Sequence, residues 1–274
     1  MSSLIKFSQG SDLKKQRNYT PTNALVRGLD VLAAVGSLGE AGVGALHKRT
    51  NIPKPTIVRN LETLEYSGYI ARNDTTGLYS LTARVLSLSA GYDKNLRLVN
   101  LASPILNSFR ETMPWPSDLA IFDTDAMVIV ETNRDPGALA LNRPVGTRLP
   151  LLASALGRAF LAFCSDQLRA TALDKYFADH PELSDGRVSM EKALAKYQTQ
   201  GFSENDQSLS KNTRGVGVPV IVNGTVEACI NTIVLCEAMT MQEVVDRCVP
   251  PLISVAKEIS IALLNDRDGT GEVT

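Results

Sequence analysis

The chain has 274 residues, of which 44% are hydrophobic and 21% are charged, and its net charge is −1. This composition is typical of a folded globular protein with one large or two ordinary domains, and it excludes disordered and fibrous classes. No apolar run approaches the ~20 residues that span a bilayer, and no hydrophobic core precedes the first charges, so we expect a cytoplasmic protein without membrane partners.

The charge is unevenly distributed along the chain. The first 84 residues carry eleven Lys and Arg against six Asp and Glu, whereas the remainder carries 17 against 23. A small basic module joined to a larger acidic one is a pattern found in DNA-binding proteins, although many solvated helices are also basic. The four cysteines show no CxxC spacing and are expected to be buried thiols: Cys164, Cys229, Cys236 and Cys248.

Residues 1–20 are polar and are expected to form a flexible tail. Residues 23–35 predict a helix with four apolar side chains on one face: Leu25, Leu29, Leu32 and Val35. A shorter helix is expected over 42–49, and Asn51 after it tolerates left-handed turn geometry.

A third helix is predicted within NIPKPTIVRNLETLEYSGYI, residues 51–70. Pro55 suits the first turn, where its missing N–H costs nothing, and it disfavours helical geometry at Lys54. One arc of the helix is apolar: Ile57, Val58, Leu61 and Leu64.

A second arc of this helix is polar and excludes acidic residues: Thr56, Arg59, Asn60 and Thr63. Phosphates repel carboxylates, and Arg, Asn and small hydroxyl groups read base edges. The arc therefore suits a DNA major groove, while an ordinary solvated face remains the alternative for this helix considered alone.

The next residues favour DNA binding. Residues 68–72 and 78–81 predict two strands joined by a turn at 73–77. Three helices followed by a two-stranded ribbon predict a winged helix-turn-helix, whose ribbon lies beside the recognition helix. Arg72 could then reach the sugar-phosphate backbone.

Several segments resemble the IclR family of bacterial transcription regulators: Arg27-Gly28-Leu29, Ile52–Arg59, Leu61–Tyr69, Gly146–Leu151 and Ala155–Ala159. The last two look like the loop and helix beside the family's effector pocket. The resemblance covers roughly residues 20–265 and implies an α+β fold, with an N-terminal winged helix-turn-helix joined by a linker helix to a GAF-like α/β effector-binding domain. The family usually has Ser or Thr where this chain has Pro55, so Thr56 is the safer candidate for a contact.

The resemblance implies a tail over 1–20, a DNA-binding domain over 21–82, a linker helix over 83–95, an effector-binding and oligomerisation domain over 96–266, and a tail over 267–274. The candidate DNA-binding residues are Arg27, Lys54, Pro55, Thr56, Arg59, Asn60, Thr63 and Arg72.

The second half predicts alternating helices and strands. Helices are expected over 82–92, 96–111, 153–163, 166–177, 190–200 and 241–264, and strands over 118–122, 127–131, 138–141, 216–222 and 226–235. Pro104 predicts a kink or break in its helix. Asn223-Gly224 is a strong hairpin signal.

Three further segments resemble a subgroup of the family, the regulators of aromatic-acid catabolism, and among them the hydroxyphenylpropionate-type activators: Met113–Asp118, Ala228–Asn231 and Ala238–Thr240. The subgroup implies an activator with no cofactor and with an aromatic carboxylic acid as its effector. Such a ligand needs an apolar slot, a cation for its carboxylate and a polar partner for a ring hydroxyl.

Trp115 is a candidate for the apolar surface of the effector site. Because it lies between two prolines, it could instead be a side chain that packs in the protein core. The candidate cations are Arg143, Arg148 and Arg214, each of which could instead form a surface ion pair, and the candidate polar partners are Ser154, Asn205 and Asn231. The remaining effector-site candidates are Ser117, Leu149, Ala153 and Gly157.

Catalytic motifs are missing from the sequence. His47 and His180 are the only histidines, and no metal-ligand spacing occurs. The glycines of Gly215–Pro219 lack the lysine of a phosphate loop, so they are expected to permit close backbone packing. We therefore expect a regulator rather than an enzyme.

The expected partners are a double-stranded DNA operator, a small-molecule effector and further copies of the chain in a homodimer or tetramer, with RNA polymerase as an additional partner of an activator. Two alternatives stay open at this point: a repressor that responds to a non-aromatic carboxylic acid, and a constitutive architectural DNA binder.

Overall fold

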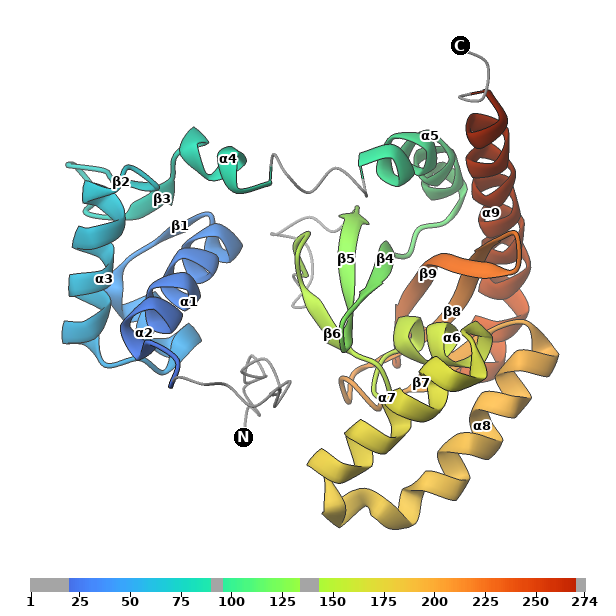
Figure 1. Cartoon of the computed structure of the whole chain (residues 1–274). Coiled ribbons are helices and arrows are strands. Elements are labelled where there is room, and N and C mark those ends of the chain that lie inside the picture. The colour runs from blue at the N-terminus through green and yellow to red at the C-terminus, as the bar shows by residue number, and fades with distance from the viewer. Residues whose placement is uncertain (1–19, 90–95, 134–142, 270–274) are drawn as a thin grey trace. The chain divides into compact units, whose positions relative to one another are not determined.

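The computed structural model describes residues 20–89, 96–133 and 143–269 (Figure 1). The expected tail over 1–19, the strand over 138–141 and the end of the linker helix lie outside these residues. The chain divides into two compact units, residues 1–93 and 94–274, which are called the first and second unit below.

The first unit contains three helices and a small antiparallel sheet. The helices are α1 (Asn23–Leu38), α2 (Val43–Thr50) and α3 (Lys54–Tyr66), and the strands are β1 (Glu40–Ala41), β2 (Ile70–Arg72) and β3 (Tyr79–Leu81). The strand order is β1-β3-β2, so the wing has three strands instead of the two expected. The sequence did not indicate β1 because two residues carry no periodicity.

The core of the first unit lies between the three helices and the wing. Its buried members are Val31, Ala34, Val35, Ala41, Leu46, Ile52, Ile57, Leu61 and Ile70. Two expectations about apolar faces are wrong, because Leu25 and Leu29 on α1 and Val58 on α3 are exposed. In α1 the buried stripe runs through Val31 and Val35, so the helix turns its first two leucines toward solvent.

The turn between α2 and α3 follows the expected chemistry at Asn51. Its φ is 57°, in the left-handed region, and its N–H donates to His47 O. His47 Nδ1 lies 2.8 Å from Ile52 O across the same turn. The expectation for Lys54 is wrong, since α3 begins at this residue and Pro55 takes the second position, where its missing N–H is still one of the four without a helical acceptor.

The expected linker helix begins as a 3₁₀ turn, Ala83–Val85, followed by one turn of α-helix, α4 (Leu86–Ser89). Thr82 connects this segment to the wing, because its hydroxyl accepts from Arg84 N and donates to Gly68 O at 2.5 Å.

The second unit is built on a six-stranded antiparallel sheet with the order β6-β5-β4-β9-β8-β7. The strands are β4 (Ser117–Asp123), β5 (Ala126–Thr132), β6 (Arg148–Pro150), β7 (Ser203–Asp206), β8 (Thr213–Val222) and β9 (Thr225–Leu235). Asn223 and Gly224 have φ values of 50° and 75° between β8 and β9, which confirms the predicted hairpin.

The helices of this unit are α5 (Leu96–Thr112), α6 (Ala155–Phe163), α7 (Asp166–Asp179), α8 (Arg187–Gln200) and α9 (Met241–Gly269). Of the kink or break expected at Pro104, a break is excluded, since α5 continues through it and keeps a buried face with Leu98, Leu106 and Phe109. The helix α9 extends into the region expected to be a tail.

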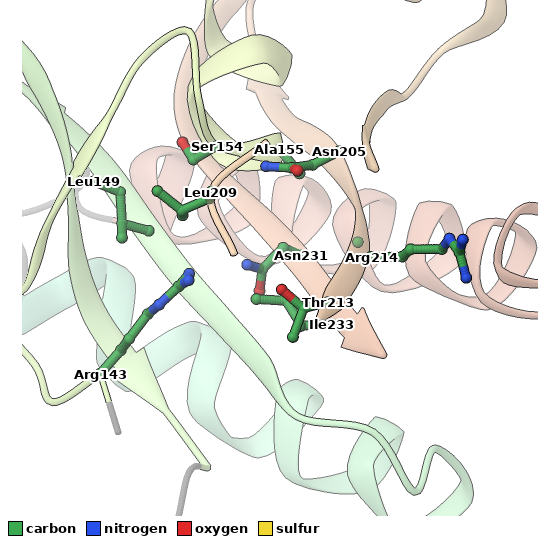
Figure 2. Close-up of a pocket in the computed structure, with 11 residues that line it drawn as sticks. Arg143, Leu149, Ser154, Ala155, Asn205, Leu209, Thr213, Arg214, Asn231 and Ile233 are labelled. Carbon is green, nitrogen blue, oxygen red and sulfur yellow. The ribbon is translucent and has the colours of Figure 1, made fainter. Parts of the chain in front are cut away.

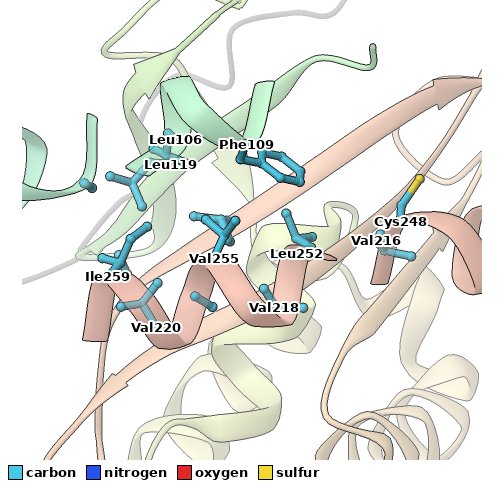
Figure 3. Close-up of a cluster of buried hydrophobic side chains, with 14 of the residues drawn as sticks. Leu106, Phe109, Leu119, Val216, Val218, Val220, Cys248, Leu252, Val255 and Ile259 are labelled. Carbon is cyan, nitrogen blue, oxygen red and sulfur yellow. The ribbon is translucent and has the colours of Figure 1, made fainter. Parts of the chain in front are cut away.

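Two cores cover the two faces of the sheet. On one face, Val216, Val218 and Val220 of β8 pack with residues of α5 and α9, as Figure 3 shows. On the other face, α6, α7 and α8 pack over Met127, Ile129 and neighbouring side chains. Because side chains alternate along a strand, residues of even and odd number on β8 face different cores.

One described helix, residues 241–266 of α9, is long and apolar enough to cross a membrane by length and composition alone, since an 18-residue window in it has a mean hydropathy of 1.3. Charged residues interrupt this helix, among them Arg247, Lys257 and Glu258, so it contains no continuous apolar run of ~20 residues. Its buried side chains recur at helical spacing and pack on the sheet and on α5: Val244, Cys248, Leu252, Val255, Ile259 and Leu263 (Figure 3). That packing is typical of the core helix of a globular unit.

Candidate nucleic-acid interface and ligand pocket

The helix α3 presents a continuous exposed stripe. Pro55, Arg59 and Thr63 are exposed and Thr56 is half-buried. Tyr66 extends this stripe, since it lies one turn beyond Thr63 and is 94% exposed. Sequence reasoning missed Tyr66, although its spacing from Arg59 and Thr63 was a usable signal.

Asn60 differs from the expectation for a base-reading residue. Its Nδ2 is buried and has no hydrogen-bond partner among the described residues. Its Oδ1 lies 3.7 Å from the position that a Cβ on Gly28 of α1 would occupy. Because one residue advances a helix by about 100°, Asn60 lies on the flank of the buried face next to α1, and not on the exposed stripe.

The wing carries a further exposed basic residue, Arg72, next to the turn between β2 and β3. The Asn73 side chain accepts from Thr75 N at 2.9 Å and from Thr76 N at 3.1 Å, which shapes the turn between β2 and β3. Arg72 on β2 is exposed, with its guanidinium 6.0 Å from the centre of the Tyr79 ring. Arg27 on α1 and Lys54 at the start of α3 are also exposed.

A small pocket lies in the second unit, over the sheet and at the start of α6, with about 20 Å³ that the centre of a water molecule can reach (Figure 2). It is lined by Arg143, Leu149, Ser154, Ala155, Asn205, Leu209, Thr213, Arg214, Gly215, Asn231 and Ile233. Six candidates from the sequence line it: Arg143, Leu149, Ser154, Asn205, Arg214 and Asn231. Five do not: Trp115, Ser117, Arg148, Ala153 and Gly157.

Close packing of the backbone places the start of α6 against strand β8, beside the pocket. Ser154 caps the helix, since its Oγ accepts from Gly157 N at 3.0 Å and donates to Pro150 O at 2.7 Å. A Cβ on Gly217 of β8 would lie only 2.7 Å from Ala155 O, so the missing side chain lets the helix start rest on the strand. This confirms the expectation that the Gly215–Pro219 glycines permit close backbone packing.

A buried polar pair forms part of the sheet beneath the pocket. Asn231 on β9 and Asp118 on β4 lie opposite each other and are 2% and 0% exposed. Asn231 Oδ1 accepts from Asp118 N at 2.7 Å, and Asn231 Nδ2 donates to Asp118 Oδ2 at 3.2 Å. Asp118 Oδ1 also accepts from the Thr132 hydroxyl at 2.8 Å.

A buried cysteine precedes this pair by two positions on β9. Burial raises the pKa of the Cys229 thiol, so this group stays neutral and packs as a small apolar side chain.

Arg158 supports the pocket from outside and was not a candidate. Its guanidinium donates to Leu152 O at 2.7 Å, to Glu204 O at 2.8 Å and to Ser208 Oγ at 3.0 Å. These three partners belong to the segments that carry Ser154, Asn205 and Leu209, so Arg158 holds neighbouring walls of the pocket together.

The two arginines of the pocket have different orientations. Figure 2 shows Arg143 extending toward Asn231, while the Arg214 side chain points away from the other residues. Arg214 Nε donates to Asp206 at 2.8 Å, and its Nη1 donates to the carbonyls of Cys236 and Met239 at 3.0 and 2.8 Å. Arg214 is therefore engaged in holding loops, whereas Arg143 is the candidate cation whose side chain extends over the pocket.

Asn205 is also engaged with backbone. Its Nδ2 donates to Ala153 O, and its Oδ1 accepts from Ser208 N at 3.0 Å. Ala153, which does not line the pocket, thus holds the Asn205 side chain through its carbonyl.

Three candidates lie away from the pocket for structural reasons. Trp115 packs against the core formed with α5 and α9, which supports the packing interpretation over the ligand slot. Ser117 is buried and accepts from Arg110 Nε at 2.8 Å. Arg148 Nη1 and Nη2 form ion pairs with Asp123 and Asp125, each at 2.6 Å, at the β4–β5 turn.

Across the described residues, no three His, Cys, Asp or Glu side chains come together in a way that could hold a metal ion.

Comparison with known proteins gives matches over both units. The family model described as IclR helix-turn-helix domain matches residues 24–74, and the model described as Bacterial transcriptional regulator IclR C-terminal matches residues 90–261. The Pca regulon regulatory protein of Pseudomonas putida is 26% identical over 245 residues, which cover 86% of this chain and 82% of that protein.

Solved structures show the same fold. A transcriptional regulator from Rhodococcus sp. RHA1 has a TM-score of 0.66 at 25% identity, with 89% of this chain and 99% of that chain covered. An IclR homolog from Microbacterium hydrocarbonoxydans, solved in complex with 4-hydroxybenzoate, has a TM-score of 0.65 at 20% identity, with 88% and 99% covered.

Proposed function

The chain belongs to the IclR family of bacterial transcriptional regulators, and from that membership we propose that it controls an aromatic-acid catabolic operon in response to a small aromatic carboxylic acid. The family members are DNA-binding regulators and not enzymes, which agrees with the expectation from the sequence. DNA binding requires access to the chromosome, so we place the protein in the cytoplasm. The subgroup resemblance of Met113–Asp118 favours activation over repression.

The exposed stripe on α3 supports α3 as the recognition helix. In a winged helix-turn-helix the second helix of the motif enters the major groove and the wing lies on the backbone. Arg59 lies in the middle of the stripe, with Thr56 and Thr63 beside it and Tyr66 at its end. We assign base reading to Arg59 and backbone contacts to Lys54, Arg72 and Tyr66.

Replacing Arg59 by Ala should weaken binding to the specific operator by on the order of 1–3 kcal/mol, because a bidentate contact to guanine is lost. The operator can be selected from random DNA and the affinity measured by gel shift. If Arg59 contacts a base, the substitution should reduce the affinity for the selected operator more than the affinity for unrelated DNA. Arg187→Ala on the exposed surface of the second unit is the matched control and should bind normally. Equal losses of affinity for the two DNAs would show that Arg59 contacts a phosphate and not a base.

Exposed apolar side chains in the first unit support self-association. Leu25 and Leu29 on α1 and Leu86 and Leu88 on α4 are all more than half exposed. Exposed apolar groups of this size are typical of protein interfaces. A homodimer, or a tetramer built from dimers, would place two recognition helices on a palindromic operator about 34 Å apart.

The pocket supports a small carboxylic acid as the effector. Arg143 extends into it, Asn231 offers a polar group, and Leu149, Leu209 and Ile233 supply apolar surface. A related fold binds 4-hydroxybenzoate, which has the same requirements. Binding would change operator affinity only if the effector binds two arrangements of the protein with different affinities.

An alternative deserves a test because no aromatic side chain lines the pocket in the described part of the chain. The pocket is also small, because the centre of a water molecule can reach only about 20 Å³ of it, far below the ~300 Å³ at which ligand sites begin. These two features favour a small non-aromatic carboxylic acid, which is the effector expected for the alternative function as a repressor.

A thermal-shift panel separates the two candidates. Benzoates and hydroxybenzoates are compared with pyruvate and glyoxylate at equal concentration, using the full-length protein. A ligand at 100 times its dissociation constant should stabilise the protein by about 2.7 kcal/mol. Stabilisation by the aromatic acids supports the proposal, and stabilisation by the aliphatic acids alone would replace it with the alternative. Operator binding with and without the stabilising ligand then tests regulation.

A further inference from the structure

The pocket in the second unit is too small to hold an effector in the arrangement that the structure shows. The centre of a water molecule can reach only about 20 Å³ of it, whereas ligand sites begin near ~300 Å³. A carboxylic acid can therefore bind only if one wall of the pocket moves. The walls differ in how firmly they are held, and this difference indicates which of them moves.

Most of the pocket wall belongs to regular structure. Asn231 and Ile233 lie on β9, which pairs with β8 along the whole hairpin. Leu149 lies on β6, which pairs with β5. The start of α6 rests directly on backbone atoms, since a Cβ on Gly157 would lie 2.2 Å from Leu151 O. A displacement of any of these walls would break several backbone contacts together.

The remaining wall is the connection between β7 and β8, residues 207–212, which is called the β7–β8 loop below. Leu209 on this loop lines the pocket and is half-buried (Figure 2). Gln207 has a φ of 62°, in the left-handed region that favours glycine, so the chain carries local strain where the loop begins. Surface connections of this kind open at a lower free energy than strands and helices do.

Ser208 connects the β7–β8 loop to the rest of the pocket. Its hydroxyl accepts from Arg158 Nη2 at 3.0 Å, and its N–H donates to Asn205 Oδ1 at 3.0 Å. The other end of the loop is tied to the sheet, because Asn212 O accepts from Cys236 N at 3.0 Å. Two hydrogen bonds of one residue therefore hold the part of the loop that carries the pocket side chain.

We infer that the β7–β8 loop is a lid that opens to admit the effector, and that Arg158 and Ser208 are positioning residues that hold it closed. Opening breaks the two hydrogen bonds of Ser208 and withdraws Leu209 from the pocket. Arg158 meanwhile keeps its bonds to Leu152 O and Glu204 O, so the other walls stay in place. This inference rests on the proposed function and concerns how its effector enters and leaves.

A lid and a fixed wall predict different binding kinetics. If the effector enters and leaves only through the open arrangement, a less stable closed arrangement accelerates both association and dissociation. Ser208→Ala removes the acceptor of Arg158. It should raise both rate constants by about tenfold, as expected for one hydrogen bond from a charged donor, and change Kd by less than about twofold.

Stopped-flow binding to the full-length protein measures these rate constants. The probe is 4-hydroxybenzoate, and pyruvate takes its place if the aromatic acid does not bind. Ser184→Ala is the matched control, since it removes an exposed hydroxyl that donates to Pro181 O in the connection between α7 and α8. This variant should keep the wild-type rate constants.

Amide hydrogen exchange tests the lid without any ligand. The N–H at position 208 is hydrogen-bonded to Asn205 while the lid is closed, and Ser208→Ala keeps this N–H. Its exchange with deuterium, resolved to the single residue by fragmentation in a mass spectrometer, should be about tenfold faster in Ser208→Ala than in wild type. Ser184→Ala should leave the exchange at position 208 unchanged.

The outcomes separate this inference from the proposed function. If Ser208→Ala leaves amide exchange at position 208 at the wild-type rate, or accelerates effector dissociation alone, the loop is a fixed wall; the inference is then overturned and the proposed function stands. If wild type binds neither probe, the proposed function is contradicted, and the exchange experiment still decides whether the loop opens.

Discussion

Replacing Glu131 by Gln should lower the free energy of unfolding of the second unit by about 3 kcal/mol, because it leaves the buried Arg110 guanidinium without its counter-charge. Arg110 on α5 and Glu131 on β5 form a two-pronged ion pair with distances of 2.5 and 2.6 Å. Their side chains are only 8% and 14% exposed. Arg110 also donates to the Ser117 hydroxyl at 2.8 Å and to Ser117 O at 3.1 Å, so one cation joins α5 to β4 and β5.

An exposed pair of similar geometry provides the control. Arg187 and Asp174 are 2.6 Å apart, but their side chains are 37% and 66% exposed. Solvent screens such a pair, so Asp174→Asn should leave the unfolding transition nearly unchanged. Urea unfolding of both variants measures the difference. Equal changes in the free energy of unfolding for the two substitutions would show that burial does not increase the contribution of the Arg110–Glu131 pair to stability.

The Arg110–Glu131 ion pair lies on the same two strands as the polar residues beneath the pocket. Ser117 and Glu131 are the sequence neighbours of Asp118 and Thr132, whose side chains are hydrogen-bonded to each other on the opposite face of the sheet. Residues next to each other on a strand point to opposite faces. The same two strands therefore carry the Arg110 contacts on one face and the Asp118 contacts beneath the pocket on the other.

Features with local chemical signals were predictable from the sequence. Asn51 and Pro55 mark the entry of the recognition helix, and Asn223-Gly224 marks the β8–β9 hairpin. These residues adopt unusual backbone geometry, or lack a donor, whatever the rest of the chain does. The helix-turn-helix and the main hairpin of the second unit followed from them.

Which face of a strand a side chain occupies was much less predictable. Arg214 and Asn231 were both candidates for the pocket, yet only Asn231 directs its side chain into it. The face depends on strand register, and a shift of one residue exchanges the two faces. Trp115, which precedes β4, was a candidate either for the ligand site or for a packing role, and it packs on the core of α5 and α9.

The short edge strands were missed because they contain too few residues to show alternation. β6 has three residues and β7 has four, and both lie at the edges of the sheet. Their position depends on pairing with β5 and β8, which so short a segment does not reveal by its own pattern. Asn205 on β7 and Leu149 on β6 were nevertheless pocket candidates, from chemistry and resemblance rather than from a predicted strand.

Replacing Gly157 by Ala should destabilise the second unit by about 3 kcal/mol, at the upper end of the range for inserting a methyl group into a packed site. Gly157 lies in the first turn of α6, and a Cβ there would lie 2.2 Å from Leu151 O and 2.3 Å from Leu151 Cα. Both neighbours are backbone atoms, so no side-chain rotation can relieve the overlap. The helix start or the loop before it has to move instead.

That displacement should also reduce effector affinity, since the N–H of Gly157 donates to the Ser154 cap and Ser154 and Ala155 line the pocket. Gly186→Ala is the matched control, because its Cβ would meet nothing within 4 Å and its φ of −78° suits alanine. Thermal unfolding and effector titration of both variants should show reduced stability and reduced effector affinity for Gly157→Ala alone. A Gly157→Ala protein with wild-type stability and affinity would mean that the close approach of α6 to Leu151 does not shape the pocket.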